Sequence, residues 1–294
     1  MNNKKHHRLM RPYILISNDD GYQAAGLKYL ITTLRPVADL LVLAPDGPRS
    51  GYSCAITTKH PFTFHRVSHE EGLEVYACSG SPVDCVKLAF NILLPRLKRR
   101  PDLVVSGINH GDNSSVNTFY SGTMGVVTEG TLQGVPSIGF SLCDMAADAD
   151  FSACGPYILR IVKKVLREGL PPFTCLNVNF PRTDGIYGCS MDCNPSTDTS
   201  TLPPAARATD PYRGIKICRM ARSNWVDEVA ECHRPGSGSP YYWLTGRVNE
   251  LEPQADDTDR WALYHGYVAI TPQTLDSTAY GLLKTWREDA ECCR

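Results

Sequence analysis

Short apolar runs alternate with amphipathic stretches from residue 13 to residue 180 of the chain. The first run, at residues 13–16, is β-branched at Ile14 and Ile16, which suits a strand buried on both faces of a sheet. Comparable runs predict further core strands at 40–44, 102–106, 136–142 and 175–180.

Apolar residues at helical spacing lie between these strands and predict helices within 26–34, 83–97, 123–132 and 157–166. Ser81, Pro82 and Asp84 mark the start of the second helix as an N-cap, a first-position proline and a first-turn acid. Residues 62–67 and 73–78 predict an additional strand pair. The alternation of strands and helices predicts an α/β fold with a doubly wound, mostly parallel, Rossmann-like sheet.

The pattern changes after Pro181. Residues 184–210 are crowded with Pro, Ser, Thr and Asp and predict a surface loop insertion, and 256–259 predicts a solvated acidic turn. Further on, we predict strands of hairpins or arms outside the main sheet, at 215–220, 225–230, 241–244 and 267–271. The chain is thus divided into a flexible N-terminal tail (1–12), an α/β core (13–183), the insertion (184–210) and a β-rich arm with a C-terminal segment (211–294).

Composition narrows the possible partners and the compartment. The 294 residues carry a formal net charge of -1 with no basic bias, so we expect no nucleic-acid partner. No apolar run approaches the length of a membrane span, and the polar, basic start lacks the apolar core of a signal peptide, so we expect a cytoplasmic protein with no membrane partner. The twelve cysteines lie mostly within apolar stretches without well-spaced pairs, which favours reduced, structural thiols.

Two adjacent acids, Asp19 and Asp20, follow the first predicted strand directly. In open α/β sheets this edge is where ligands bind. Two like charges this close repel each other, which favours a cation or a shared proton between them. Gly21 permits a turn that lets both carboxylates face one point. The alternative is an Asx-type turn that happens to carry two acids.

Three loops, at 18–21, 45–51 and 107–122, follow predicted parallel strands and should therefore emerge at one edge of the sheet. They supply oxygen donors and no sulfur, a set that favours a hard cation such as Mg²⁺ or Mn²⁺. These donors are Asp19, Asp20, Ser50, Asn109 and Asn113. Ser50 has a plainer interpretation as a turn residue.

The segment Ser121-Gly122-Thr123 adds hydroxyls and backbone N–H groups at a predicted helix start, which is a natural anion site. A divalent cation beside such a helix terminus can catalyse the hydrolysis of a phosphoryl ester. Ser121 or Thr123 could instead only cap the helix.

Several motifs together resemble those of the SurE (survival protein E) family, over about residues 13–272. Each motif is short, but their joint order is specific. They are Ser-Asn-Asp-Asp-Gly (17–21), Ala-Pro-Asp-x-x-x-Ser-Gly (44–51), Gly-Ser-Pro-x-Asp-Cys-Val-Lys-Leu-Ala (80–89), Ser-Gly-Ile-Asn-x-Gly-x-Asn (106–113), Tyr-Ser-Gly-Thr-Met (120–124), Tyr-Tyr-Trp (241–243) and His-Gly-Tyr-Val-x-Ile-Thr-Pro (265–272).

The resemblance implies a metal-dependent phosphatase acting on nucleoside monophosphates, a 5′-nucleotidase, with 3′-nucleotidase and exopolyphosphatase activities as further options. It implies a homodimer or homotetramer formed through C-terminal arms, and one divalent cation per subunit. The metal ligands would be Asp19, Asp20, Ser50 and Asn109, and the phosphate contacts Asn109, Ser121, Gly122 and Thr123. The insertion at 184–210 is longer than is usual in the family.

For the reaction we expect Asp19 to orient or deprotonate the attacking water, with direct attack by Asp19 on phosphorus as an alternative. Asn109 would bridge cation and phosphate, and Ser121 and Thr123 would donate to the phosphoryl oxygens. Asn18 and Asn113 complete the candidate substrate-binding residues, and aromatic residues such as Tyr52 or Tyr120 could stack on the base.

Two other functional classes are open to a sheet of this kind. A nicotinamide-dependent oxidoreductase is disfavoured because no G-x-G-x-x-G follows Ile16 and the acids there would repel a pyrophosphate. A catalytically silent nucleotide- or metal-binding module would keep the ligands without turnover. Phosphate release with and without Mn²⁺ separates these possibilities.

Overall fold

A computed structural model of the chain describes residues 11–184, 210–234, 236 and 238–289. Most of the predicted tail (1–12) and of the predicted insertion (184–210) lies outside these residues, so both stay predictions. No helix among the residues described is long and apolar enough to cross a membrane.

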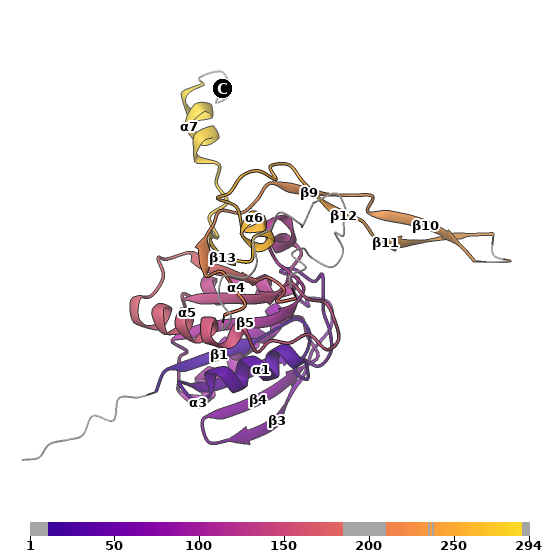
Figure 1. The fold of residues 1–294 in the computed structure, drawn as a ribbon. Coiled ribbons are helices and arrows are strands. Elements are labelled where there is room, and N and C mark those ends of the chain that lie inside the picture. The colour runs from indigo at the N-terminus through magenta and orange to yellow at the C-terminus, as the bar shows by residue number, and fades with distance from the viewer. Residues whose placement is uncertain (1–10, 185–209, 235, 237, 290–294) are drawn as a thin grey trace, which may run out of the picture.

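A nine-stranded sheet forms the centre of the molecule (Figure 1), in the order β3-β4-β2-β1-β5-β6-β7-β13-β8. The six strands from β4 to β7 are parallel, while β3 is antiparallel to β4, and β13 is antiparallel to β7. The α/β prediction is therefore confirmed. The strands are β1 (Tyr13–Ser17), β2 (Asp39–Pro45), β3 (Phe64–Glu70), β4 (Leu73–Cys78), β5 (Leu103–His110), β6 (Ser137–Leu142), β7 (Thr174–Phe180), β8 (Ile215–Ile217) and β13 (Val268–Thr274).

Helices cover both faces of this sheet. On one face, α1 (Ala25–Leu34) and α5 (Cys154–Glu168) pack against alternate residues of the central strands, such as Ile14 and Ile16. On the other face, α2 (Pro82–Leu88) and α4 (Gly122–Leu132) pack against the intervening residues, such as Leu15. Alternation along each strand thus fills two separate cores, which is why the strands read as continuous apolar runs.

The predicted helix at 83–97 begins as expected but is interrupted. Ser81 and Asp84 form a capping box in which each side chain accepts a hydrogen bond from the backbone N–H of the other residue. Beyond α2 the chain widens into a π-helical turn, η1 (Ala89–Leu93), before α3 (Leu94–Leu97). Pro95 explains the break, because it has no N–H to donate to the preceding turn.

The predicted loop at 107–122 is wrong over its first residues, because β5 continues to His110. A register shift between Ser106 and Asn109 lets the strand pair again with β6, at Asn109 and His110. Asn109 and His110 are polar and do not continue the apolar pattern of the strand, so the extension of β5 was not predicted. A short 3₁₀ helix, η2 (Ser115–Phe119), then leads to α4.

The C-terminal part differs most from the prediction. The strands predicted at 215–220 and 267–271 are not in an arm, because β8 and β13 extend the main sheet. The strand predicted at 225–230 is divided at Asp227, which has a positive φ, into β9 (Ser223–Val226) and β10 (Val229–His233). Three elements were not predicted: β12 (Arg247–Glu250), α6 (Asp259–Tyr264) and α7 (Tyr280–Glu288).

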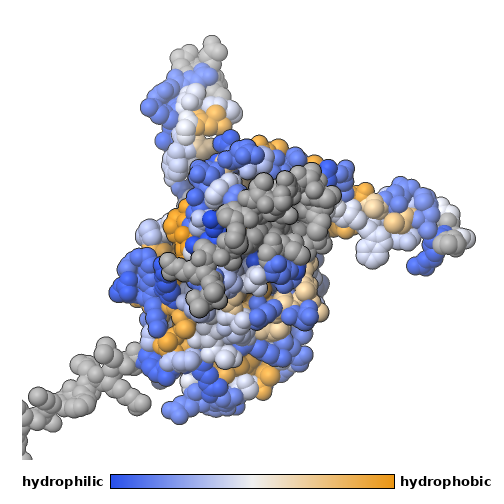
Figure 2. All heavy atoms as spheres, viewed as in Figure 1, coloured by the Kyte–Doolittle hydropathy of each residue, from blue (hydrophilic) through white to orange (hydrophobic). Residues whose placement is uncertain are grey.

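An arm does project from the core (Figure 1). It consists of the pair β9–β12 followed by a hairpin of β10 and β11 (Pro240–Leu244). Apolar residues are interspersed with polar ones on the surfaces of the hairpin and of α7 (Figure 2). Tyr267, the first residue of the strand predicted at 267–271, stacks on Trp261.

Candidate functional site

The parallel strands β2, β1 and β5 are neighbours, so their carboxyl ends bring three loops to one edge of the sheet. Backbone hydrogen bonds join the loops around the acid pair. The N–H of Arg49 donates to the carbonyl oxygen of Asp19 at 2.6 Å, and the N–H of His110 donates to Oδ2 of Asp20 at 3.3 Å. Gly21 has a φ of 99°, so the turn after the acids needs a glycine, as predicted.

The first turn of α4 packs directly on Asp19. Oγ1 of Thr123 donates a hydrogen bond of 2.5 Å to Oδ1 of Asp19, and both side chains are buried. A Cβ on Gly122 would lie 2.7 Å from the Cβ of Asp19, so only glycine allows this approach. The helix N-terminus that was predicted as an anion site therefore lies against the acid pair.

The electrostatics of the pair favour protonation or a cation. Burial raises the pKa of Asp19 to about 6, with the neighbouring Asp20 adding to the rise and the Thr123 hydrogen bond opposing it. Burial also raises the pKa of Asp20 to about 6, against the opposing effect of the His110 N–H. Within the described ranges, no lysine, arginine or histidine forms an ion pair with either carboxylate.

The remaining predicted metal ligands lie beside the pair. Nδ2 of Asn109 donates to the carbonyl oxygen of Gly111 at 2.8 Å, so the amide oxygen is the atom that a cation would use. Ser50 is exposed and follows Arg49, whose N–H ties this loop to Asp19. No cluster of three or more His, Cys, Asp or Glu side chains able to hold a metal ion occurs in the described part of the chain. A cation at this edge would thus need hydroxyl and amide oxygens as well as the two carboxylates, which is the donor set of Mg²⁺ or Mn²⁺.

Ser121 and Asn18, two other predicted site residues, bond to the backbone of their own segments. Oγ of Ser121 accepts a hydrogen bond from the N–H of Met124, so Ser121 caps α4. The side-chain amide of Asn18 both donates to and accepts from the backbone of Gly21, which closes the turn after the acids.

Asn113 bonds to neighbouring strands of the sheet. Its Nδ2 donates to Oγ of Ser141 and its N–H donates to Oδ1 of Asn179, so it engages β6 and β7. The structure therefore brings Asp19, Asp20, Gly122 and Thr123 into direct contact or adjacency, places Asn109 and Ser50 beside them, and gives Asn18 and Asn113 structural bonds.

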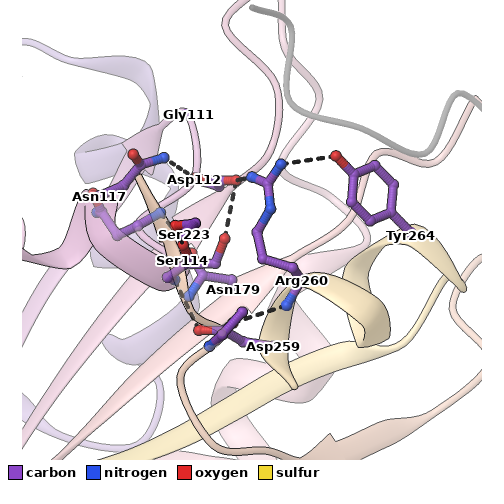
Figure 3. A network of polar contacts seen from close by, with 12 residues as sticks. Gly111, Asp112, Ser114, Asn117, Asn179, Ser223, Asp259, Arg260 and Tyr264 are labelled. Atoms are coloured by element: carbon purple, nitrogen blue, oxygen red, sulfur yellow. Dashed lines mark hydrogen bonds and ion pairs between the residues drawn. The ribbon is translucent and has the colours of Figure 1, made fainter. Parts of the chain in front are cut away.

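A second polar cluster next to the site was not predicted (Figure 3). Asp259, assigned from sequence to a solvated turn, is buried, and its carboxylate accepts hydrogen bonds from the N–H groups of Ser115 and Ala221. The side chain of Arg260 is 3% exposed and forms an ion pair with Asp112. The prediction of a solvated turn failed because the partners that make burial of these charges possible lie outside the local sequence; Ser115 is 144 positions from Asp259, and Asp112 is 148 positions from Arg260.

Comparisons with known proteins agree with this geometry. The family described as Survival protein SurE matches residues 14–227. A 5′-nucleotidase SurE of Phocaeicola vulgatus is 51% identical over 94% of this chain and 97% of its own length, and a 5′-nucleotidase SurE of Bacteroides fragilis is 49% identical over 94% and 98%. The crystal structure of the SurE protein from Aquifex aeolicus superposes with a TM-score of 0.72 at 33% identity, covering 95% of this chain and 100% of that one.

Proposed function

This chain belongs to the SurE family and is a 5′-nucleotidase, and we propose that it hydrolyses nucleoside monophosphates at the Asp19–Asp20 edge with one divalent cation per subunit. The observation that carries this proposal is the acid pair, in which Asp19 is buried against the first turn of α4 and Asp20 is half-buried, with no ion pair to a cationic side chain among the described residues.

Asp19, Asp20, Ser50 and Asn109 would hold Mg²⁺ or Mn²⁺. When bound, such a cation neutralises charge on phosphoryl oxygens and lowers the pKa of a bound water. The protein would supply the other interactions. The backbone N–H groups of the first turn of α4 are donors for a phosphate, and the helix N-terminus favours its negative charge. The hydroxyl of Thr123 has a single proton, which it donates to Asp19, so it would serve a phosphate only by turning away from that carboxylate.

Asp19 is the residue for orienting or deprotonating the attacking water, or for direct attack on phosphorus. Thr123 donates to one of its oxygens, which fixes the orientation of the carboxylate. The position of Gly122 brings the α4 terminus within van der Waals reach of the same carboxylate. The Asp19 carboxylate and the N–H donors of α4 would thus both lie close to the phosphorus of a bound phosphate, without a large movement of either element.

Exposed aromatic residues beside the site are candidates for the base. Tyr52, Phe119 and Tyr120 are all about half exposed. Their two loops are joined, because Ser53 donates from its N–H to the carbonyl oxygen of Tyr120 and from Oγ to that of Phe119. A base stacked on such rings would add binding energy with little discrimination between bases.

We also propose that the protein works in the cytoplasm as a homodimer or homotetramer. The hairpin β10–β11 supports assembly, because it exposes Tyr242 and Trp243 far from the core.

The test is release of inorganic phosphate from AMP, GMP, CMP, UMP and glucose 6-phosphate, in Mn²⁺ and in excess chelator. We expect turnover with Mn²⁺ only, and a loss of at least roughly 100-fold for Asp19→Asn and for Asp20→Asn, the scale of a removed electrostatic stabiliser. Asp148→Asn, at an exposed acid, is the matched control.

The outcomes separate the alternatives. Full activity in chelator would remove the metal assignment. Mn²⁺ binding without phosphate release would indicate a silent binding module. Preference for glucose 6-phosphate over all four nucleotides would leave a phosphatase and remove the nucleotide assignment.

A further inference from the structure

The loop between β5 and α4 connects two parts of the site. It starts just after Asn109 and His110, and it ends at Ser121, which caps the helix that carries Thr123. We call residues 111–120 the site loop. Its position determines how the candidate ligand Asn109 and the donors of α4 lie relative to each other.

The site loop is held by β9 and α6, the two elements where the arm meets the core, which we call the arm base. Asp112, whose side chain is 1% exposed, receives Nη1 of Arg260 on Oδ2 at 3.1 Å. Arg260 lies in the first turn of α6 and also donates from Nε to Glu250 at 2.9 Å and from Nη2 to the hydroxyl of Tyr264 at 2.7 Å. Figure 3 shows the guanidinium lying between Asp112 and Tyr264.

Three further hydrogen bonds join the site loop to β9 and α6, in addition to this ion pair. Asp259 accepts the N–H of Ser115 at 2.9 Å, and the hydroxyls of Ser115 and Ser223 are in hydrogen-bond contact. The indole N–H of Trp225 donates to Oδ1 of Asn117 at 3.1 Å. Every one of these partners belongs to β9 or α6, so the arm base contacts the site loop along most of its length.

The planar guanidinium explains why position 260, at the centre of these contacts, is an arginine. Only its fork of donors can contact Asp112, Glu250 and Tyr264 at once from a buried position. Asp112 in turn accepts from Ser114 and Asn117, which fixes the turn of the site loop.

We propose that Arg260 is a positioning residue for the hydrolysis, and that its buried ion pair with Asp112 holds the site loop so that Asn109 and the first turn of α4 lie correctly for catalysis. This role rests on the proposed function. The hydrogen bonds and ion pairs of Arg260 go to Asp112, Glu250 and Tyr264, which are not candidate site residues, so its effect should be on the rate of the bound complex rather than on substrate binding.

The test compares Arg260→Met with Arg219→Met. Arg219 is a matched control because it lies between β8 and β9, outside the elements that hold the site loop, and pairs with two carboxylates, Glu252 and Asp257, while remaining exposed. We expect Arg260→Met to lower kcat for AMP with Mn²⁺ by about 10- to 100-fold, since a misplacement of about 1 Å can cost about 100-fold, with KM changed less than threefold. Arg260→Lys should retain an intermediate kcat, and Arg219→Met the kcat of the wild type.

Amide hydrogen exchange gives a second readout that needs neither metal nor turnover. The N–H groups of Asn113 and Ser115 are bonded in the structure, so peptides covering 111–120 should exchange at least tenfold faster in Arg260→Met than in Arg219→Met. Because the single variant leaves Asp112 buried without its partner charge, Asp112→Asn/Arg260→Met serves if the single variant does not fold, with the same expectations.

A folded variant with wild-type kcat and unchanged exchange in 111–120 would overturn the proposal. Slower turnover through a raised KM, with the loop protected as before, would do the same. If the wild type released no phosphate, the proposed function would fail, while the exchange comparison would still decide whether Arg260 holds the site loop.

Discussion

Asp19 and Asp20 are destabilising where they stand unless something compensates their charge. Asp19 is buried and Asp20 is half-buried, and the pKa of each is raised to about 6. Natural chains retain such unfavourable groups mainly where function needs them. The acid pair is therefore the strongest single mark of function in this chain.

Ionisation of these two acids is less favourable in the folded protein than in the unfolded chain. The stability of the protein should therefore depend on pH and on bound metal. The folded protein holds the proton of Asp19 more tightly than the unfolded chain, so in chelator the free energy of unfolding should fall as pH rises from about 4 to about 6. The loss is about 3 kcal/mol for a shift of this size. Denaturant titrations at pH 4 to 7 measure it, and Mn²⁺ should restore the stability at pH 7.

Asp19→Asn should remove only the contribution of Asp19, roughly half of the pH dependence in chelator, because burial also raises the pKa of Asp20 to about 6. A wild-type free energy of unfolding that stays flat across this range, in chelator, would mean that the two acids are not strained in the folded state.

Thr123 and Ser121 looked equivalent in the sequence, but the structure separates them. Ser121 accepts from the backbone as a cap, whereas Thr123 donates to Asp19. Thr123→Val should lower kcat by about 10- to 1000-fold. The hydrogen bond from Thr123 lowers the pKa of Asp19, so its removal should raise that pKa. The acid limb of the pH profile of kcat/KM should therefore move to higher pH.

Thr131→Val is the control for this experiment, since Thr131 is a buried threonine of the same helix whose hydroxyl donates to the backbone carbonyl of Val127. We expect it to stay within about threefold of the wild type. Equal effects of the two substitutions would assign Thr123 to helix packing.

Helix α4 is placed by the approach of its first turn to the end of β1. The added methyl group in Gly122→Ala would lie 2.7 Å from the Cβ of Asp19, so one of the two elements must move. We expect a loss of at least tenfold in kcat, although alanine is the better helix former. Steady-state kinetics with Mn²⁺ measures it.

Gly281→Ala is the matched control in helix α7, where an added Cβ meets no atom within 4 Å. Wild-type activity in Gly122→Ala would show that the contact between α4 and Asp19 tolerates displacement and does not set the geometry of the site.

Elements defined by local patterns were predictable, and elements defined by distant partners were not. Helix α2 has its cap, proline and apolar stripe within a few residues, so its start could be located from sequence. Helix α6 begins at Asp259, whose burial depends on the N–H groups of Ser115 and Ala221. The oxygen donors at the strand ends were predictable because parallel order alone brings them together. The Arg260 contacts were not, since nothing local reveals a partner 148 positions away.

At the scale of the whole molecule, the sheet and the arm divide the C-terminal part between them. Strands β8 and β13 close one side of the core sheet, while β10 and β11 pair only with each other among the strands described. Because β9 and α6 bond to the site loop, the arm base is coupled to the candidate site, whereas the outer hairpin of β10 and β11 is available for another purpose.

That purpose, we expect, is assembly. An isolated two-stranded hairpin is marginally stable in water, yet this one exposes 59% of Tyr242 and 61% of Trp243. Aromatic residues of this kind are enriched in the cores of protein interfaces. A second copy of the chain that covers the hairpin would stabilise it and bury both rings.

Light scattering at micromolar concentration should therefore give the mass of a dimer or a tetramer for the wild type. Tyr242→Ser/Trp243→Ser should shift the mass toward that of one chain, because burial of two aromatic side chains contributes several kcal/mol to association, about 2 kcal/mol or more for each. Leu132→Ser, at an exposed apolar residue at the end of α4, is the control and should keep the wild-type mass. A wild type that scatters as a single chain would refute assembly, and a double variant with unchanged mass would place the interface elsewhere than on the hairpin.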